Sequence, residues 1–149
     1  MLYLLLTVIC GSNEKVRAKC EQLYTGDDRV TVRGRVAPLY PLMAAADVLM
    51  TKSGGLTTTE AMTVGTPMLI VHPIRGCETA NAEFFEKRGM AAYARSAEEI
   101  TDKLKALLED AQARENMIAA QRREIDPDGA RKLAECLVKL TQERMNTEK

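Results

Sequence analysis

Short apolar runs alternate with helical patterns over the first 95 residues of the chain. Apolar and β-branched runs predict strands, and apolar residues spaced three and four apart predict helices between them. The predicted strands are 2–10, 30–34, 47–51, 68–71 and 91–93, and the predicted helices are 13–24, 38–46, 55–64 and 78–87. This alternation predicts an α/β fold with a parallel sheet and helices on both faces. The continuous apolar run at the start predicts a first strand that is buried on both faces.

The chain after residue 95 has helical patterns only. Ser96-Ala-Glu-Glu has the spacing of a capping box, and an apolar helical face follows it. Asp-Pro-Asp-Gly at 126–129 breaks the pattern before a last amphipathic helix. We therefore expect a single domain over 1–149, with the sheet and its crossover helices over about 1–95 and a tail of two or more helices over 96–149.

Composition and charge exclude several classes of function. The chain has 21 basic and 21 acidic residues, so no net charge attracts it to nucleic acid or anionic lipid. Its apolar start is shorter than the ~20 residues that span a bilayer and lacks the features of a signal peptide. Four cysteines without a Cys-x-x-Cys pair and a single histidine predict no metal site and favour free thiols in the cytoplasm.

The segment 51–61, Thr-Lys-Ser-Gly-Gly-Leu-Thr-Thr-Thr-Glu-Ala, joins a predicted strand to a predicted helix. Two glycines allow close backbone approach, and the first helical turn offers free N–H groups to an anion. Thr57 to Thr59 add hydroxyl groups, and Glu60 could accept hydrogen bonds from a sugar diol. By itself the segment could equally be an ordinary turn before a helix. It is not a P-loop, and no Gly-x-Gly-x-x-Gly indicates a NAD-binding domain.

A second polar segment, 72–81, leaves the fourth predicted strand and enters a helix. Glu78 and Asn81 are three residues apart and share one helical face near its start. Both segments follow predicted parallel strands, so this face lies at the same end of the sheet as Gly55. Ligands of parallel sheets bind at that end, beyond the carboxyl ends of the strands. Two converging polar groups suit sugar hydroxyls, although either one alone would be an ordinary cap.

Taken together, five segments over roughly residues 5–95 resemble the C-terminal domain of one family of glycosyltransferases. This family contains the monogalactosyldiacylglycerol synthases and diacylglycerol glucosyltransferases and is related to the peptidoglycan N-acetylglucosaminyltransferase. The segments are, in order, Gly34-Arg-Val-Ala-Pro-Leu, Leu42-Met-Ala-Ala-Ala-Asp, Lys52-Ser-Gly-Gly-Leu-Thr-Thr-Thr-Glu-Ala, Gly65-Thr-Pro and His72-Pro-Ile-Arg-Gly-Cys-Glu-Thr-Ala-Asn. The resemblance implies a GT-B architecture of two Rossmann-like domains. The C-terminal one binds a UDP-sugar, and the other binds a lipid acceptor such as diacylglycerol.

The resemblance also implies a set of donor-binding residues and a metal-independent reaction. The backbone at Val36 would read the uracil, Glu60 would hold the ribose, and the positive end of the helix would stabilise the leaving diphosphate in place of a cation. The full implied set is Val36, Ser53, Gly54, Gly55, Leu56, Thr57, Glu60, Cys77, Glu78 and Asn81, of which the last three would line the sugar pocket.

The sequence departs from the family pattern in three respects. Cys77 stands where the family has glutamine, and Arg75 stands where proline is expected. The family domain also begins with one more strand and a glycine-rich loop, and the acceptor domain precedes it. We therefore expect a fragment, a truncated reading frame or a split enzyme, with the isolated chain inactive.

Three functional hypotheses and one candidate base remain open at this stage. The first hypothesis is the donor-binding domain of a hexosyltransferase, the second a UDP-sugar epimerase-like domain, and the third a non-catalytic donor-binding subunit with a separate membrane partner. His72 is a candidate base without an identified carboxylate partner, and Asp126 and Asp128 predict a turn and helix cap rather than a metal motif. An exposed interdomain face would promote self-association. Peripheral attachment of the full enzyme to a membrane stays open.

Overall fold

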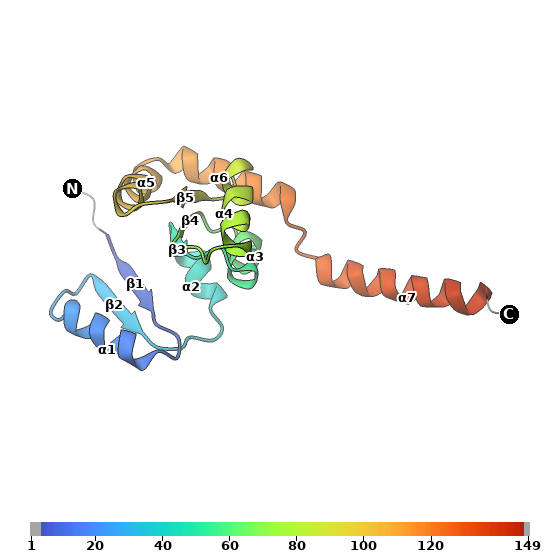
Figure 1. Cartoon of the computed structure of the whole chain (residues 1–149), viewed down its shortest axis with the longest axis horizontal. Helices are drawn as coiled ribbons and strands as arrows, with labels where there is room; N and C mark the ends of the chain where they lie inside the picture. Colours follow the sequence, from blue (N-terminus) through green and yellow to red (C-terminus); the bar gives the residue numbers. More distant parts are fainter. Residues whose placement is uncertain (1–3, 148–149) are drawn as a thin grey trace. The chain divides into compact units, whose positions relative to one another are not determined.

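The computed structural model describes residues 4–147, with side chains to residue 144. The chain divides into two compact units, Met1–Leu39 and Tyr40–Lys149. Figure 1 labels their helices and strands. All paired strands run parallel, so the predicted α/β class is confirmed, but the pairs fall into two sheets, β1-β2 in the first unit and β3-β4-β5 in the second. The expectation of a single domain over 1–149 stays a prediction.

The first unit is a strand–helix–strand motif. Its elements are β1 (Leu6–Ile9), α1 (Glu14–Leu23) and β2 (Val30–Arg33). Leu6 of β1 lies opposite Val30 of β2 in the parallel register. Asn13 caps α1 by accepting a hydrogen bond from the Val16 N–H at 3.1 Å. The unit thus has the local structure that the alternating pattern predicts.

The first strand is not buried on both faces, which corrects the expectation for residues 2–10. Residues 2 and 3 of that range lie outside the described residues. In the described part, β1 covers Leu6–Ile9, and its residues alternate between half-buried and exposed. No residue is buried among those described in this unit, and Leu23 of α1 is 69% exposed. Two paired strands with one helix have too few elements to cover both faces of a sheet, so the apolar run gains little burial within its own unit.

The second unit contains the buried core. It begins with α2 (Tyr40–Ala45), β3 (Leu49–Thr51), α3 (Gly55–Val64), β4 (Met68–Val71), α4 (Cys77–Lys87) and β5 (Ala92–Ala94). β4 is the central strand, with β3 and β5 on either side. Met68, Leu69 and Ile70 of β4 are completely buried. Residues 68–70 of the predicted strand 68–71 are therefore covered on both faces, as expected for the central strand of a parallel sheet, whereas Val71 is half-buried.

Three helices follow the sheet of the second unit. They are α5 (Ala97–Glu109), α6 (Ala111–Glu124) and α7 (Gly129–Thr147). Ser96 caps α5 by accepting a hydrogen bond from the Glu99 N–H at 3.2 Å, as the capping-box pattern predicts. Leu107 of α5 and Met117 of α6 join the core cluster. The helical tail thus contributes two helices to the packing of the sheet.

The last helix, α7, exposes the apolar side chains that the sequence places on one face. Leu133, Leu137, Val138 and Leu140 are each more than half exposed. The expected self-association, which concerns an exposed interdomain face rather than this helix, stays a prediction. Within the described range, no helix has the length and apolar character needed to cross a membrane.

Candidate functional site

The β3–α3 turn places the start of α3 at the carboxyl end of β3. Gly54 has extended backbone angles (φ −68°, ψ 132°) and directly precedes the helix, and no side chain caps this helix end among the described residues. A Cβ atom added to Gly55 would meet no heavy atom within 4 Å, and Leu56 is 86% exposed. The first-turn N–H groups of α3 therefore lie at an open surface where an anion could approach the backbone.

Thr58 holds this turn from behind. Its side chain is completely buried, and its Oγ1 donates to the Gly54 carbonyl oxygen at 2.9 Å. The Thr58 N–H donates to the same oxygen at 3.1 Å. The expectation that all three threonines 57–59 offer hydroxyls to a ligand is therefore wrong for Thr58, because burial and the bond to Gly54 engage its hydroxyl. Thr57 is half-buried and Thr59 is exposed.

Glu60 lies in the second turn of α3 and is exposed. The helix dipole favours acidic residues in the first turn, and α3 has none there. Glu60 lies beyond that turn, so the dipole does not account for its position. Glu60 is four residues after Leu56 and shares that side of the helix. Glu60 therefore lies about one helical turn after the open N-terminal end of α3.

The Glu78 carboxylate is the most heavily engaged group near the turn. Glu78 is the second residue of α4, and its side chain is only 12% exposed. Oε2 accepts from the Ile74 N–H at 2.7 Å, and Oε1 accepts from Lys52 Nζ at 3.0 Å. The Ile74 N–H, and after it Lys52, holds the pKa of the Glu78 carboxyl below its usual value. Glu78 is therefore ionised at neutral pH.

Ser53 connects α4 to the β3–α3 turn. It is completely buried, and its Oγ donates to the Glu78 carbonyl oxygen. Asn81 Nδ2 donates in turn to the Ser53 carbonyl oxygen at 3.1 Å. The structure thus brings Ser53, Gly54, Glu78 and Asn81 together, as the strand-end argument predicts. It also shows that Glu78 and Asn81 connect the start of α4 to the neighbouring loops through hydrogen bonds, and their contact with a donor stays a prediction.

Lys52 and Ile74 are the partners of Glu78 that sequence reasoning did not identify. The Lys52–Glu78 pair joins residues 26 positions apart, and Ile74 contributes only its backbone. A lysine directly before Ser-Gly-Gly was the one available signal. It gives charge, but it does not tell which of the nearby carboxylates pairs with it.

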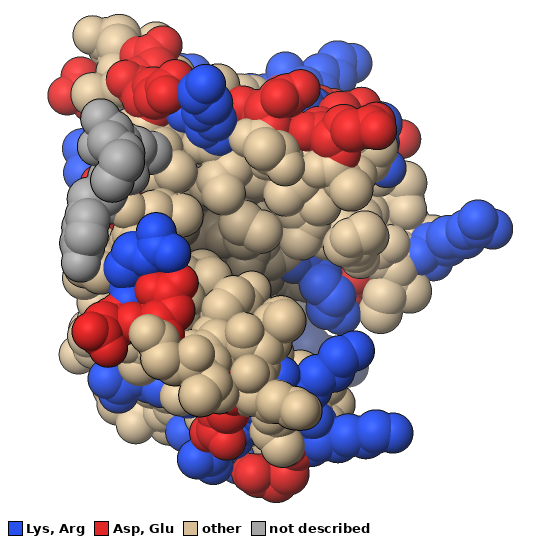
Figure 2. Space-filling model, turned by 90° about the vertical axis from the view of Figure 1, so that its left-hand side faces the viewer, with Lys and Arg blue, Asp and Glu red and all other residues tan. Residues whose placement is uncertain are grey.

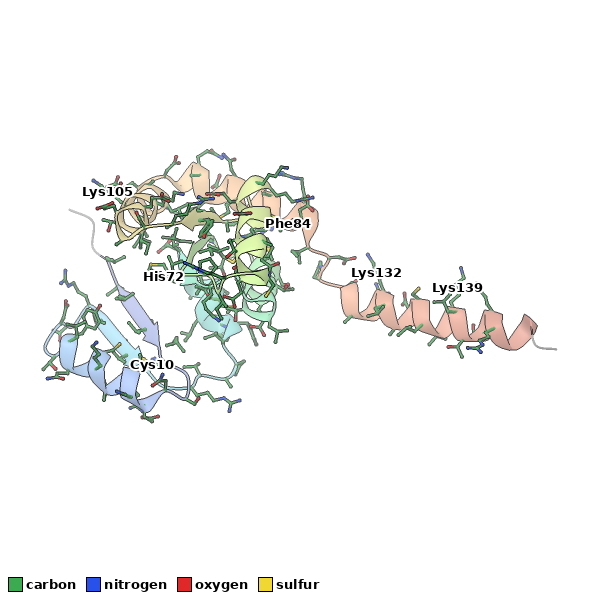
Figure 3. The ribbon with its side chains drawn as sticks, viewed as in Figure 1. Cys10, His72, Phe84, Lys105, Lys132 and Lys139 are labelled. Atoms are coloured by element: carbon green, nitrogen blue, oxygen red, sulfur yellow. The ribbon has the colours of Figure 1, made fainter. Side chains whose placement is uncertain are left out.

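Three other candidate residues are not members of this hydrogen-bonded group. Cys77 is exposed at the first position of α4. Val36 is half-buried in the loop after β2 and belongs to the first unit. His72 follows β4 with a left-handed backbone angle of φ 45° and is exposed (Figure 3). No carboxylate of the described range is hydrogen-bonded to its imidazole, so its role as a base stays a prediction.

Asp126 and Asp128 form a turn before α7. Asp126 Oδ1 accepts from the Asp128 N–H at 2.9 Å, and its other oxygen accepts from Lys132. Asp128 pairs with Arg131 at 2.9 Å in the first turn of the helix. The predicted turn is therefore confirmed. The predicted cap stays a prediction, because the Asp128 carboxylate contacts the Arg131 guanidinium rather than a first-turn N–H group.

Charges of both signs are distributed over the surface. Figure 2 shows acidic and basic side chains interspersed on the face that it draws. Exposed ion pairs such as Arg17–Glu21 and Lys105–Glu109 join residues four apart on single helices. Pairs of this kind contribute little to stability. On that face the distribution agrees with the zero net charge of the chain.

Comparison with known proteins gives the family of this chain. Residues 3–124 match the family described as Glycosyl transferases group 1. The chain belongs to the group 1 glycosyl transferases. The matched range includes the whole β3–α3 turn and the start of α4, so the site described above lies inside the family domain.

Among sequence relatives of this group 1 glycosyl transferase are enzymes named processive diacylglycerol beta-glucosyltransferase. The one from Bacillus subtilis (strain 168) is 36% identical over 106 residues, which cover 70% of this chain and 28% of the relative. The one from Bacillus pumilus (strain SAFR-032) is 34% identical over 113 residues, covering 75% and 30% respectively. The chain thus spans less than a third of the length of these relatives.

Solved structures confirm the fold of this group 1 glycosyl transferase. MurG from Acinetobacter baumannii aligns with a TM-score of 0.72 and 22% identity over 93% of this chain and 42% of its own. A putative UDP-N-acetylglucosamine 2-epimerase from Listeria monocytogenes has the same TM-score of 0.72, with 13% identity over 94% of this chain and 46% of its own. The predicted fold of this chain, an α/β domain of the kind found in GT-B glycosyltransferases, is confirmed, whereas the second domain of the GT-B architecture stays a prediction.

Proposed function

We propose that this chain binds the donor of a sugar transfer, a UDP-hexose, for a glycosyltransferase whose acceptor is a lipid such as diacylglycerol. The observation that carries the proposal is the open, uncapped start of α3 within a domain 36% identical to a diacylglycerol glucosyltransferase. Backbone N–H groups at the positive end of a helix are a general anion site. A nucleoside diphosphate is the anion that this family membership favours.

In the proposed complex, the parts of the donor are divided among three groups of residues. The diphosphate lies on the turn Ser53 to Thr57, where Gly54 and Gly55 allow close backbone approach. The ribose hydroxyls bond to the exposed Glu60 carboxylate, and the backbone at Val36 reads the uracil. The hexose lies beside the start of α4, near Cys77, Glu78 and Asn81. Each carboxylate oxygen of Glu78 already accepts one bond and keeps a lone pair for a hydroxyl.

The proposed reaction needs positioning of the donor, stabilisation of the leaving group and a candidate base from this chain. The acceptor hydroxyl attacks the anomeric carbon, the bond from that carbon to UDP breaks, and UDP leaves with the bonding electrons. The acceptor proton passes to a base, for which His72 is the candidate. The N–H groups of α3 stabilise the negative charge that develops on the leaving diphosphate. The helix end therefore does what a cation does in other transferases, and we propose a metal-independent reaction.

We propose that the lipid acceptor is bound outside the residues of this chain, by another domain or by a partner subunit. The chain spans 28% of the Bacillus subtilis relative, so most of that enzyme corresponds to nothing here. In this proposal the isolated chain binds donor and does not transfer sugar. Any attachment to the membrane comes through the acceptor-binding part.

Fold likeness does not separate sugar transfer from epimerisation, because a transferase and an epimerase structure align equally well. Sequence identity favours transfer, because the sequence relatives described above at 34–36% identity are all named glucosyltransferases. Incubation of the chain with UDP-glucose or UDP-N-acetylglucosamine and analysis of the sugar nucleotide separates the two. An altered sugar on UDP in the absence of an acceptor would identify an epimerase.

The proposal is tested by titrating the chain with UDP, ADP and GDP in a calorimeter. We expect selective binding of UDP, and Glu60→Ala should weaken it by ~1.5–3 kcal/mol, roughly ten- to over a hundredfold, because a charged hydrogen-bond partner of the ribose is lost. Glu115→Ala, which removes another exposed glutamate of the second unit, is the matched control and should leave UDP binding unchanged. Absence of binding to all three nucleotides would contradict the proposal.

A further inference from the structure

The Glu78 carboxylate lies next to the turn at which the diphosphate is proposed to bind. A Cβ atom built on Gly54 would be 3.6 Å from Glu78 Oε1, the nearest heavy atom to that position. Gly54 is the N-cap of α3. A fixed negative charge this close to an anion site opposes binding of a diphosphate, and the opposition grows where the surroundings exclude water. The site therefore needs a way to tolerate Glu78.

Glu78 can neither move away nor easily lose its charge. Its Oε2 is held by the Ile74 N–H at 2.7 Å, and its own carbonyl oxygen accepts the Ser53 hydroxyl. The same contacts fix the loop between β4 and α4 to the turn before α3. A carboxylate that accepts a backbone N–H and lies beside a cation is favoured in its charged form. Its negative charge is therefore a permanent part of this surface.

Lys52 supplies the compensating positive charge. Its Nζ lies 3.0 Å from Oε1, which is the same oxygen that lies nearest to the Gly54 position. The Lys52 side chain is about half exposed, whereas that of Glu78 is mostly covered. Arg75, a basic residue of the loop before α4, makes no ion pair with Glu78 in the described part of the chain. The positive charge of Lys52 therefore compensates the negative charge of Glu78 next to the turn.

We infer that Lys52 is a positioning residue of the donor site, which neutralises Glu78 so that a diphosphate can bind at the Gly54–Gly55 turn while Glu78 keeps the adjoining loop in place. This inference rests on the proposed function. It differs from a direct Lys52–phosphate contact, in which Lys52 would contribute the same affinity whatever residue stands at position 78. It also gives Glu78 an effect on UDP itself and not only on a sugar.

A double-mutant cycle with UDP as the probe separates these roles. We expect Lys52→Met to weaken UDP binding at least tenfold in the otherwise unaltered chain, because Glu78 then faces the diphosphate unpaired. In a Glu78→Gln background, where the amide oxygen can still accept from the Ile74 N–H, the same change should weaken binding less than threefold. Glu78→Gln alone should raise UDP affinity, and Lys52→Arg should retain it. Each variant's thermal unfolding is measured beside its affinity.

Lys105→Met is the matched control, because Lys105 is an exposed lysine paired with Glu109 on α5. It should leave UDP binding unchanged. An equal loss from Lys52→Met in both backgrounds would overturn the inference in favour of a direct phosphate contact. A fall in UDP affinity with Glu78→Gln alone would overturn it as well. Failure of the unaltered chain to bind UDP would instead contradict the proposed function, so the two failures are distinct.

Discussion

Single hydrogen bonds from buried polar side chains connect the elements of the second unit. Ser53 joins the turn before α3 to the start of α4, and Thr66 donates from its Oγ1 to the Met43 carbonyl oxygen at 2.8 Å. Both side chains are fully buried and both are hydrogen-bonded, as burial of a hydroxyl requires. Bonds of this kind fix the strand-end turns to their neighbours, so the proposed site rests on a framework of buried hydrogen bonds.

Gln121 is the largest polar member of this framework. It is completely buried on α6, and its Nε2 donates to the Thr66 and Met90 carbonyl oxygens at 3.0 and 2.9 Å. Its Oε1 has no hydrogen-bond partner among the described residues. One amide group thus satisfies the carbonyls that follow α3 and precede β5.

Replacement of Gln121 by leucine should destabilise the fold by about 1–3 kcal/mol, because two buried carbonyl groups lose their donor. Urea unfolding followed by circular dichroism measures the free energy of unfolding. Gln112→Leu is the control: Gln112 is exposed on the same helix, and its substitution should change stability by no more than ~0.5 kcal/mol. Equal stability of the Gln121 variant and the unaltered chain would show that these bonds contribute nothing net.

At the scale of whole elements, Glu86 joins α4, β5 and α5. Its carboxylate accepts from Arg95, which follows β5, at 2.7 Å and from Lys103 of α5 at 3.4 Å. The hydrogen bond from Arg95, together with the nearby charges, lowers the pKa of Glu86 below the ordinary value of 4.5. Lys103 also donates to the Tyr93 carbonyl oxygen in β5. This carboxylate therefore links the edge strand of the sheet to the helices on either side of it in sequence.

The lowered pKa of Glu86 predicts a pH dependence of stability. The unfolded chain binds a proton at Glu86 at higher pH than the folded chain does, so the contribution is fully present above about pH 4.5 and is lost as the pH falls through the lower folded pKa. Glu86→Gln should therefore be destabilising at pH 7 and lose that difference as the pH falls below 4.5. Urea unfolding of both proteins at several pH values measures this. A constant difference across the range would contradict the assignment.

The elements most accurately predicted from the sequence are those with strong stop signals. The helix 55–64 and the strand 68–71 have the predicted bounds, because Gly65 takes a left-handed conformation (φ 76°) that ends the helix and Pro67 precedes the strand. Of the strand expected over 2–10, residues 2 and 3 lie outside the described residues, and the described part forms a strand over Leu6–Ile9. An apolar run does not itself show where pairing begins; the register with Val30 decides that.

The sequence identified the position of the candidate site better than its internal contacts. The Gly54–Gly55 turn follows from glycine before a helix, and the nearness of Glu78 follows from the parallel strands. The Lys52–Glu78 pair could not be predicted, because it depends on the separation of two loops in space. The burial of Thr58 could not be predicted either. Thr57, Thr58 and Thr59 are identical residues, so the sequence does not indicate which of them lies in the core.

At the scale of the whole molecule, the two units differ in the buried residues and in the proposed binding residues that they contain. Every buried residue of the described range lies in the second unit, from Met43 to Gln121. That unit also contains the turn proposed for the diphosphate and Glu60, proposed for the ribose. The first unit contains Val36, the residue proposed to read the base. Stability and phosphate binding are therefore expected to reside in one unit and base selectivity in the other.

Removal of residues 1–39 tests this division. We expect the chain 40–149 to fold, because it retains the complete buried core, and to bind UDP, ADP and GDP with similar affinities, because all three share the diphosphate and ribose and the contact to the base is lost. Circular dichroism and thermal unfolding verify folding, and calorimetry measures the three affinities. Glu60→Ala in the shortened chain should then weaken all three nucleotides alike. If the shortened chain still preferred UDP, the second unit would itself read the uracil, and the assignment of that role to Val36 would be wrong.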